Sequence, residues 1–409
     1  MTGSVVRLGV LAIAVAGGAG IARAQTLPSQ PLALADGRVT IGGDVSATVG
    51  SADPGFFDYT DYEHSALRMV RMNLAAAVKA GDHLTVLGDV QTENIDSIRP
   101  YALYLRVRPW TRRAVDVQIG RVPPTFGAFA RRSYAIDNPL IGYPLAYQYL
   151  TTVRPDALPA TADELLQKRS GGWLVRYSTG RLTPDHGVPL VSAFRWDTGV
   201  QVHAEFQPGG VIRTTASVTS GTVSNPRVRD DNGGKQVAGR LEWRPNAAII
   251  VGTSAARGAF VADSAARSAN AESSAGDLTQ TAWGADVEYS RDYYLVRAET
   301  IVSEWRVPLL SLPGHPLALR ASSLSVEGRY KVWPGAYVAA RAEHLGFGSI
   351  VGTAATLPWD APVTRFEVGT GYSIQRNLLL KFAYQHNARD GGRLQRSANQ
   401  VATQAVFWF

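Results

Sequence analysis

The chain has 409 residues, a formal net charge of +7 and no cysteine. Without cysteine there is no disulfide framework, no thiolate zinc site and no cysteine nucleophile, and the mild charge, spread without any Lys/Arg block, does not indicate nucleic-acid binding. No stretch beyond Ala24 approaches the roughly 18 apolar residues of a membrane-spanning helix, so any spanning segments must be strands closed into a barrel.

The first 24 residues have the features of a secretory signal peptide. Arg7 gives a basic start, an apolar and glycine-rich run follows from Leu8 to Ile21, and residues 22–24 form a small-x-small cleavage site. The alternative of a membrane helix is weaker because the run is too short to span a bilayer. We therefore predict export, a short periplasmic segment over residues 25–37, and a transmembrane barrel over residues 38–409.

From Val39 onward, apolar and polar residues alternate with the period of two that is typical of a β-strand. The pattern begins over residues 39–49 and recurs in segments near Val70, Tyr101, Val237 and Leu378. Many segments run about ten residues, which is the length of a tilted membrane strand. The apolar residues of each strand are expected to form an outer belt that faces lipid, and the polar residues that alternate with them are expected to surround water.

The connections between these segments alternate between short and long. Tight turns are predicted at residues 80–82, 109–111, 207–210, 244–246, 290–292, 333–335 and 375–377, and longer links at 51–66, 257–280, 305–320 and 349–362. This rhythm is typical of an all-β, transmembrane antiparallel β-barrel with brief periplasmic turns and extended outer loops. We place about eighteen strands, with sixteen as the alternative, because the segment over residues 171–206 is ambiguous.

A soluble β-sandwich or propeller would also show alternation. So many strands carry more apolar face than one soluble core could hide, whereas barrels of roughly 16 to 18 strands enclose water. The chain also ends on Phe407, Trp408 and Phe409, which resembles the C-terminal signal of outer-membrane barrels. Aromatic residues near the predicted turns fit an interfacial girdle.

Residues 117–127 read Val-Gln-Ile-Gly-Arg-Val-Pro-Pro-Thr-Phe-Gly, a strand that ends in glycine and leads through Pro and Phe-Gly into a long loop. In layout and in this short motif the chain resembles bacterial porins, in particular the phosphate-selective porin class. The resemblance implies a channel narrowed by a loop, and it implies no particular solute.

The connection over residues 122–170 is by far the longest and is rich in Tyr, Phe, Pro and Arg. Long loops in compact proteins are usually functional or disordered, and the aromatic content argues against disorder. Thr161 and Glu164 form a capping box for a short helix that runs through Lys168. We expect the loop to fold into the lumen and to form a constriction; packing over the outer rim or at a subunit contact is the alternative. The residues expected at the constriction are Arg131, Arg132, Tyr134, Tyr143 and Arg154.

Bases and acids balance on the lumen parity. The wall residues singled out are Arg71, Arg106, Arg176, Arg240, Arg297, Arg341, Arg365, Glu242, Glu299, Glu343 and Glu367. Several residues of opposite charge lie two positions apart on one strand, so their side chains face the same way. This arrangement favours structural ion pairs between neighbouring strands over a row of charges that selects permeating ions. Only the periplasmic mouth is clearly basic, which predicts a mild anion preference.

These features predict an outer-membrane porin-like channel for passive diffusion of small polar solutes, with no enzyme activity, cofactor or metal. Asp230, Asp231 and Asn232 could bind calcium, but a solvated turn uses the same residues. A non-conducting barrel for adhesion, assembly or surface display is the main alternative, and a barrel hydrolase is a lesser one. The expected partners are outer-membrane lipid and lipopolysaccharide, the barrel-assembly machinery and small polar solutes, and the sequence leaves open whether a homotrimer forms.

Overall fold

The computed structural model describes residues 30–60, 64–110, 114–193, 195–207, 209–228, 230–269, 277–308 and 317–409. The predicted signal peptide lies outside these ranges, as do residues 25–29 of the segment predicted after it. The described part of that segment contains β1 (Leu32–Leu34), which pairs with the first barrel strand but stands outside the ring.

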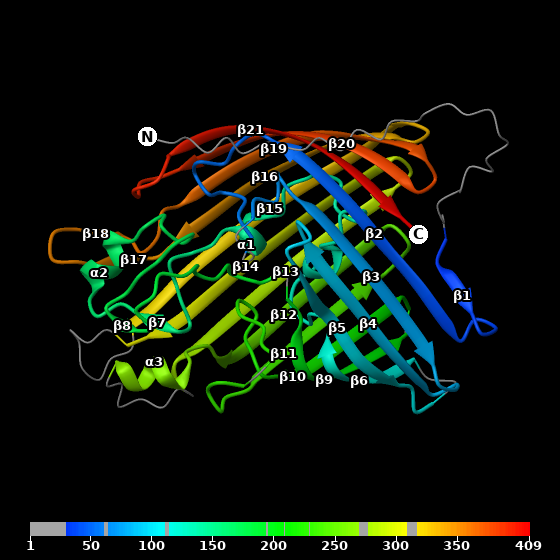
Figure 1. Ribbon diagram of the computed structural model, residues 1–409, viewed down its shortest axis with the longest axis horizontal. Coiled ribbons are helices and arrows are strands. Elements are labelled where there is room, and N and C mark those ends of the chain that lie inside the picture. Colours follow the sequence, from blue (N-terminus) through cyan, green and yellow to red (C-terminus); the bar gives the residue numbers. More distant parts are fainter. Residues whose placement is uncertain are drawn as a thin grey trace, which may run out of the picture.

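The alternating segments form a closed antiparallel barrel of sixteen strands (Figure 1). In order around the ring, the strands are β2 (Val39–Gly50), β3 (Val70–Lys79), β4 (Leu84–Glu93), β5 (Ser97–Val107), β6 (Val115–Val122), β9 (Asp197–Phe206), β10 (Val211–Thr219), β11 (Gln236–Arg244), β12 (Ile249–Ala259), β13 (Thr279–Arg291), β14 (Tyr294–Val307), β15 (Leu317–Trp333), β16 (Ala336–Phe347), β19 (Val363–Gln375), β20 (Leu378–Arg389) and β21 (Ser397–Trp408). The first and last strands close the ring, with Asp44 opposite Trp408 and Gly50 opposite Ala402.

The strand count is therefore sixteen, which is the alternative given above and one hairpin fewer than the eighteen strands expected first. β6 pairs directly with β9, with Val122 opposite Asp197, so residues 123–196 form one connection rather than a loop that ends near residue 170. Residues 174–179 do alternate between exposed and buried, as a strand would. Their partner is the rest of the loop, through an isolated bridge between Val175 and Asp185, and not the barrel wall.

The two ends of the barrel differ as the connector pattern predicts. The seven predicted turns, as far as the structure describes them, lie at one end, where β2 begins and β21 ends, and this end is the periplasmic one by the usual rule for such barrels. One further short connection, residues 94–96 between β4 and β5, lies at the opposite end. The opposite, outer end carries the β7 (Ala157–Leu158) and β8 (Thr179–Gly180) pair, the β17 (Ser349–Val351) and β18 (Thr356–Pro358) hairpin, and α2 (Ala162–Gln167) and α3 (Asp263–Ser268), all at the left of Figure 1.

The helices are short, and three of them belong to the connection between β6 and β9: η1 (Ala130–Arg132), α1 (Leu145–Gln148) and α2. α2 starts where the capping box predicts, because the Thr161 hydroxyl accepts a hydrogen bond of 3.1 Å from the Glu164 backbone amide. Within the described ranges, no helix has both the length and the apolar character required to cross a membrane.

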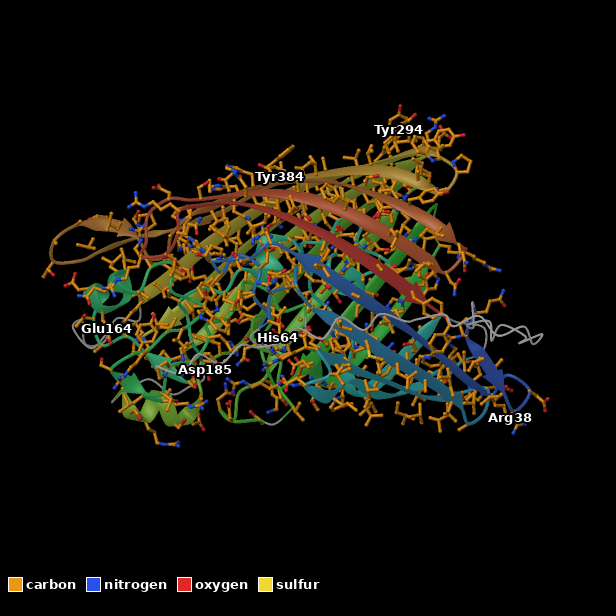
Figure 2. The ribbon with its side chains drawn as sticks, turned by 45° about the horizontal axis from the view of Figure 1, so that its top comes forward. Arg38, His64, Glu164, Asp185, Tyr294 and Tyr384 are labelled. Atoms are coloured by element: carbon orange, nitrogen blue, oxygen red, sulfur yellow. The ribbon has the colours of Figure 1, made fainter. Side chains whose placement is uncertain are left out.

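The side-chain parity follows the predicted pattern over most of the wall. Outward residues such as Val237 and Trp283 are 62% and 61% exposed, whereas the inward Arg240 is 6% exposed. Tyr294 and Tyr384, labelled in Figure 2, project from the outer face of the barrel. A continuous apolar belt thus surrounds the protein, with aromatic side chains gathered near the short turns.

The interior is not polar along its whole height, which corrects the expectation of a wet lumen throughout. Ile301, Trp305 and Val307 share the inward parity of Arg297 on β14, yet they are buried in an apolar cluster. The cluster also contains aromatic and aliphatic residues of the interior loop, including Tyr147 and Leu158. The outer part of the barrel is therefore filled by a dry core, and the charged residues lie nearer the periplasmic end.

Candidate functional site

The candidate site is the interior loop over residues 123–196 together with the wall that it contacts. Two glycines let the chain leave the wall. Gly120 has φ +127°, and a Cβ there would lie 2.5 Å from the Leu103 carbonyl oxygen. Gly127 has φ +78°, and a Cβ there would collide with the Tyr147 hydroxyl. Both glycines belong to the porin-like motif, so the motif has a physical reason at this bend.

The first part of the loop is anchored to one side of the wall by hydrogen bonds. The Thr125 hydroxyl donates to Ser217 on β10 at 2.8 Å, and the Gly127 amide donates to Ser254 on β12 at 3.2 Å. Glu299 on β14 accepts from the Ala128 amide and from the Tyr147 hydroxyl, each at 2.7 Å. The Glu299 carboxylate, predicted on the lumen wall, therefore holds two parts of the loop.

Three residues predicted at the constriction join the loop to strands around the lumen. Arg132 forms an ion pair of 2.8 Å with Glu288 on β13, and the Tyr134 hydroxyl donates to Asp89 on β4 at 2.6 Å. Arg71 on β3 donates to the Tyr143 hydroxyl. Contacts to β3, β4, β13 and β14 place the loop inside the barrel, not over its rim. The backbone of Arg131 lies in η1.

Arg154 does not occupy the position predicted for it. Its guanidinium is fully buried within the loop, where it pairs with Asp156 at 2.9 Å and donates to the carbonyl oxygens of Val175 and Thr183. With two hydrogen bonds to Asp156, these contacts use four of the five N–H donors of the guanidinium, so Arg154 stabilises the loop and does not face a permeating solute. Arg176 needs a similar correction, because it is exposed on the loop segment 174–179 and is not part of the barrel wall.

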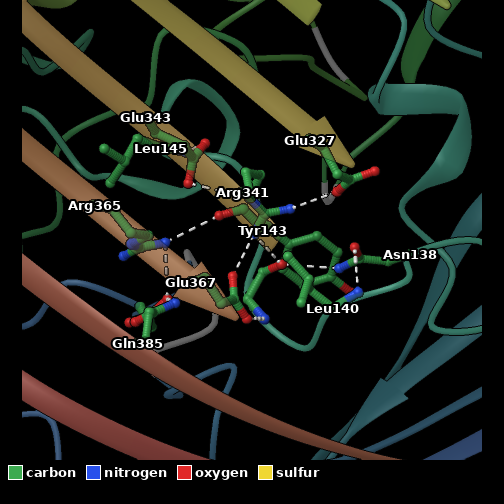
Figure 3. A network of polar contacts seen from close by, with 12 residues as sticks. Asn138, Leu140, Tyr143, Leu145, Glu327, Arg341, Glu343, Arg365, Glu367 and Gln385 are labelled. Carbon is green, nitrogen blue, oxygen red and sulfur yellow. Dashed lines mark hydrogen bonds and ion pairs between the residues drawn. The ribbon is translucent and has the colours of Figure 1, made fainter. Parts of the chain in front are cut away.

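Arg341 on β16 lies at the centre of a buried network (Figure 3). Its guanidinium is 2.6 Å from Glu367 and 3.2 Å from both Glu327 and Glu343. It also donates to the Gly142 carbonyl oxygen of the loop at 2.6 Å. Glu367 in turn accepts from the Gly142 amide at 2.9 Å, so one loop residue is held from both its polar groups.

A second loop, over residues 51–69, reaches the same network, which the sequence analysis did not foresee. Arg365 on β19 pairs with Asp58 of this loop at 3.1 Å and donates to the Phe57 and Tyr143 carbonyl oxygens. Burial raises the pKa of the Asp58 carboxyl to about 7, while Arg365 acts in the opposite direction. The only sequence feature that could have indicated this insertion is the aromatic run at Phe56 and Phe57.

Lys381 on β20 is the other unexpected anchor. Its side chain is buried, and its ammonium group donates to the carbonyl oxygens of Ala135, Asn138 and Leu140 in the interior loop. These three bonds use all the donors of an ammonium group. Lys381 therefore fixes the path of loop residues 135–140.

The remaining wall charges, except Arg106, form ion pairs. Arg71 lies 2.6 Å from Glu93, Arg240 lies 2.6 Å from Asp286, and Arg297 contacts Glu288 at 2.8 Å and Glu327 at 3.3 Å. Glu242 lies between Arg213, Arg240 and Arg244. Arg106 on β5 is half-buried and makes no ion pair within the part of the chain that the structure describes.

A charged cavity of about 370 Å³ lies between the loop and the wall. Phe129, Arg132 and Pro144 of the loop form one side, and β10 to β16 form the other. Its charged lining residues are Arg132, Arg213, Arg240, Arg244, Arg297, Arg341, Glu242, Asp286, Glu288, Glu299 and Glu327. Arg244 ends its strand at a short turn, so the cavity extends toward the periplasmic end.

The acidic residues and histidines of the described ranges are dispersed. There, no group of three or more His, Asp or Glu residues is placed to hold a metal ion. Asp230 of the predicted turn pairs with Lys235, and Asn232 donates to the Ala259 and Val261 carbonyl oxygens. These contacts fit a loop turn, with its side chains committed to protein partners.

The sixteen-stranded antiparallel barrel with a loop folded into its lumen has the fold of a porin-type outer-membrane β-barrel. No protein-family model and no curated protein sequence matches the chain. Among solved structures, the anion-selective porin from Comamonas acidovorans is similar over 91% of this chain and 99% of its own, with a TM-score of 0.54 and 9% identity. OmpF of Salmonella typhi, in complex with daunomycin, covers 91% and 97% with a TM-score of 0.53 and 10% identity. OmpT, an outer-membrane protein of Vibrio cholerae, covers 91% and 98% with a TM-score of 0.53 and 12% identity. At such identities the likeness shows the fold.

Proposed function

We propose that this barrel is a channel for passive diffusion of small polar solutes with a weak anion preference. The observation that carries the proposal is the charged cavity of about 370 Å³ between the interior loop and the wall. A charged lining inside a barrel admits hydrated solutes and discriminates among them by charge. The anion-selective porin with the same fold supports this direction.

The dry outer core limits the size of the proposed pathway. Trp305 and Trp359 are fully buried, and their ring centroids lie 5.9 Å apart in the apolar cluster. Such packing leaves little room for water at the outer end, so we expect a small single-channel conductance. It also favours the second candidate, a non-conducting barrel for adhesion, assembly or surface display.

Planar-bilayer recording of the purified protein separates the two functions. Stepwise current with a reversal potential shifted toward the anion equilibrium potential would support the proposal. A reversal potential of cation selectivity would contradict the anion preference. Silence from a barrel shown to be folded by heat-modifiable gel mobility would favour the non-conducting alternative.

The proposal includes the route to the membrane and the assembly. We propose export by cleavage after Ala24, insertion by the barrel-assembly machinery with Phe407, Trp408 and Phe409 as the C-terminal signal, and contact with lipopolysaccharide in the outer leaflet. OmpT of Vibrio cholerae is described in a trimer form, which supports a homotrimer here as well. The mass of the detergent-solubilised protein, measured by light scattering, tests the trimer directly.

A further inference from the structure

A second cavity, here called the mouth cavity, lies inside the barrel at its periplasmic end. Its volume of about 760 Å³ is within the range of roughly 300 to 1,000 Å³ that is typical of sites for small organic molecules. The wall residues that face it include Tyr337, Leu379 and Trp408. The first two share the inward parity of Arg341 and Lys381 on their strands, and the third lies opposite the buried Asp44.

One side of the mouth cavity is apolar and aromatic. A small cluster joins the interior loop to the wall there, and its members are Ala135, Ile136, Tyr337, Leu379, Val406 and Trp408. Ile136 lines the cavity from the loop, and Trp408 lines it from the wall. The Tyr337 hydroxyl donates to the Pro139 carbonyl oxygen at 2.9 Å, which holds the loop over this side. An apolar part of a bound molecule therefore has both aromatic and aliphatic surface to contact.

The other side of the mouth cavity is basic. Its described lining contains three bases, Arg329, Lys331 and Arg376, and no acidic residue. Lys331 lies opposite Tyr337 in the pairing of β15 with β16, so it faces the lumen, and Arg376 lies in the turn between β19 and β20. None of the three bases forms an ion pair within the described ranges, and Lys331 and Arg376 are exposed.

Arg329 is half-buried and lacks an acceptor. Its Nε is buried without a hydrogen-bond partner, and its guanidinium lies 5.8 Å from the centroid of the Tyr337 ring. Glu327 lies two residues away on the same face of β15, but Arg297 donates to one of its carboxylate oxygens and Arg341 to the other. Buried polar groups in folded proteins are usually hydrogen-bonded, so this guanidinium is suited to an anionic group that the chain does not supply.

We propose that the mouth cavity binds a small aromatic carboxylic acid as its anion, with the carboxylate at Arg329 and Lys331 and the ring on the Trp408 side. A guanidinium presents two parallel N–H donors to a carboxylate, and the ammonium group adds a second positive charge. Aromatic rings pack favourably on one another in offset or edge-to-face arrangements. The proposal names a solute class and rests on the proposed channel function for the solute's route, because Glu327 of the charged cavity is the neighbour of Arg329 on one strand face.

Isothermal titration calorimetry of the purified full chain in a neutral detergent, with 3-phenylpropanoate as the probe, measures the binding. We expect one site in the wild type. Loss of a charge-assisted hydrogen bond should weaken binding roughly tenfold in Arg329→Gln and roughly a hundredfold in Arg329→Gln/Lys331→Gln. The uncharged 3-phenylpropanamide, which keeps the ring, and acetate, which keeps the carboxylate, should each bind at least roughly tenfold more weakly than the probe.

The chain offers a matched control for the loss of charge and a variant for the apolar side. Arg38 and Lys79 are exposed at the same end of the barrel, and Figure 2 shows Arg38 on a different side of that end from Tyr294. Arg38→Gln/Lys79→Gln removes two positive charges and should bind the probe as the wild type does. Ser373 lines the mouth cavity opposite Leu379, so Ser373→Phe should occupy the space of the ring and weaken binding at least roughly tenfold.

Equal binding of the probe to Arg329→Gln/Lys331→Gln and to the charge control would overturn the proposal. Equal binding of the amide and the acid would do the same, and acetate or inorganic phosphate that binds as tightly as the probe would show a site for any small anion. Heat-modifiable gel mobility confirms that each variant is folded. Calorimetry requires no ion flow, so the binding proposal and the channel proposal can fail independently.

Discussion

Replacing Arg341 by methionine should release the interior loop from the wall. The wild-type side chain is fully buried between Glu327, Glu343 and Glu367. Methionine keeps much of the volume but removes the only base that contacts Glu343 and Glu367 within the described ranges. Breaking a buried ion pair by removing one partner costs about 3 to 5 kcal/mol.

Much of this cost should fall on loop docking, because Arg341 and Glu367 together hold Gly142. A loss of about 3 kcal/mol raises the population of undocked loop more than a hundredfold, since about 1.4 kcal/mol corresponds to a factor of ten. Limited proteolysis of the folded barrel measures this population through the initial rate of cleavage within residues 123–196. Single-channel conductance should rise in parallel if the loop narrows the pathway.

Arg320→Met is the matched control for Arg341→Met. Arg320 pairs with Glu304 at 2.8 Å, but its side chain is 73% exposed. An exposed pair contributes only about 0 to 1 kcal/mol. Cleavage of Arg341→Met within twofold of the control would refute the assignment of Arg341 as the main anchor of the loop.

Three further predictions address the packing of the lumen. Because burial raises the pKa of Asp58 from 3.8 to about 7, the folded state holds a proton that the unfolded state releases, so stability is highest at low pH and falls as the pH rises between these two values. Urea titrations should show the free energy of unfolding of the wild type falling between about pH 4 and 7, with a flatter profile in Asp58→Asn. Equal slopes in the two proteins would contradict the raised pKa. Trp359→Ala should lower the free energy of unfolding, measured in urea, by about 3 to 5 kcal/mol, because this fully buried ring packs on Trp305 and Phe347. A loss below about 1 kcal/mol would mean that the outer core is not tightly packed. Deletion of residues 128–159 should increase single-channel conductance. An unchanged conductance would show that this loop does not narrow the channel.

The sequence predicts the barrel wall well because strand alternation and turn chemistry are local. The seven predicted short turns lie at one end of the barrel, and the outward parity forms the apolar belt. Thr161 caps its helix through a contact three residues away. Such features depend on neighbours in the chain, so periodicity and residue type are enough to find them.

Non-local partners explain what the sequence did not predict. The segment around Arg176 has the alternation of a strand, but it packs on its own loop, and nothing in its pattern distinguishes the two partners. Trp305 has the parity of a lumen residue, yet whether such a side chain meets water or a loop depends on residues more than a hundred positions away. Lys381 was on the expected face, but its three carbonyl acceptors belong to a loop whose path the sequence does not give.

The seam between the first and last strands constrains the order of assembly. Residues 44–50 pair with residues 402–408, so ring closure joins segments from the two ends of the chain. Until the final strand arrives, β2 and β20 each present a row of unsatisfied backbone groups that can pair with other chains. β1 already covers β2 at Val39 and Ile41 through a local hairpin, beyond the point where the final strand ends. The N-terminal residues of the described chain therefore shield part of an open edge during biogenesis, before the rest of the wall has formed.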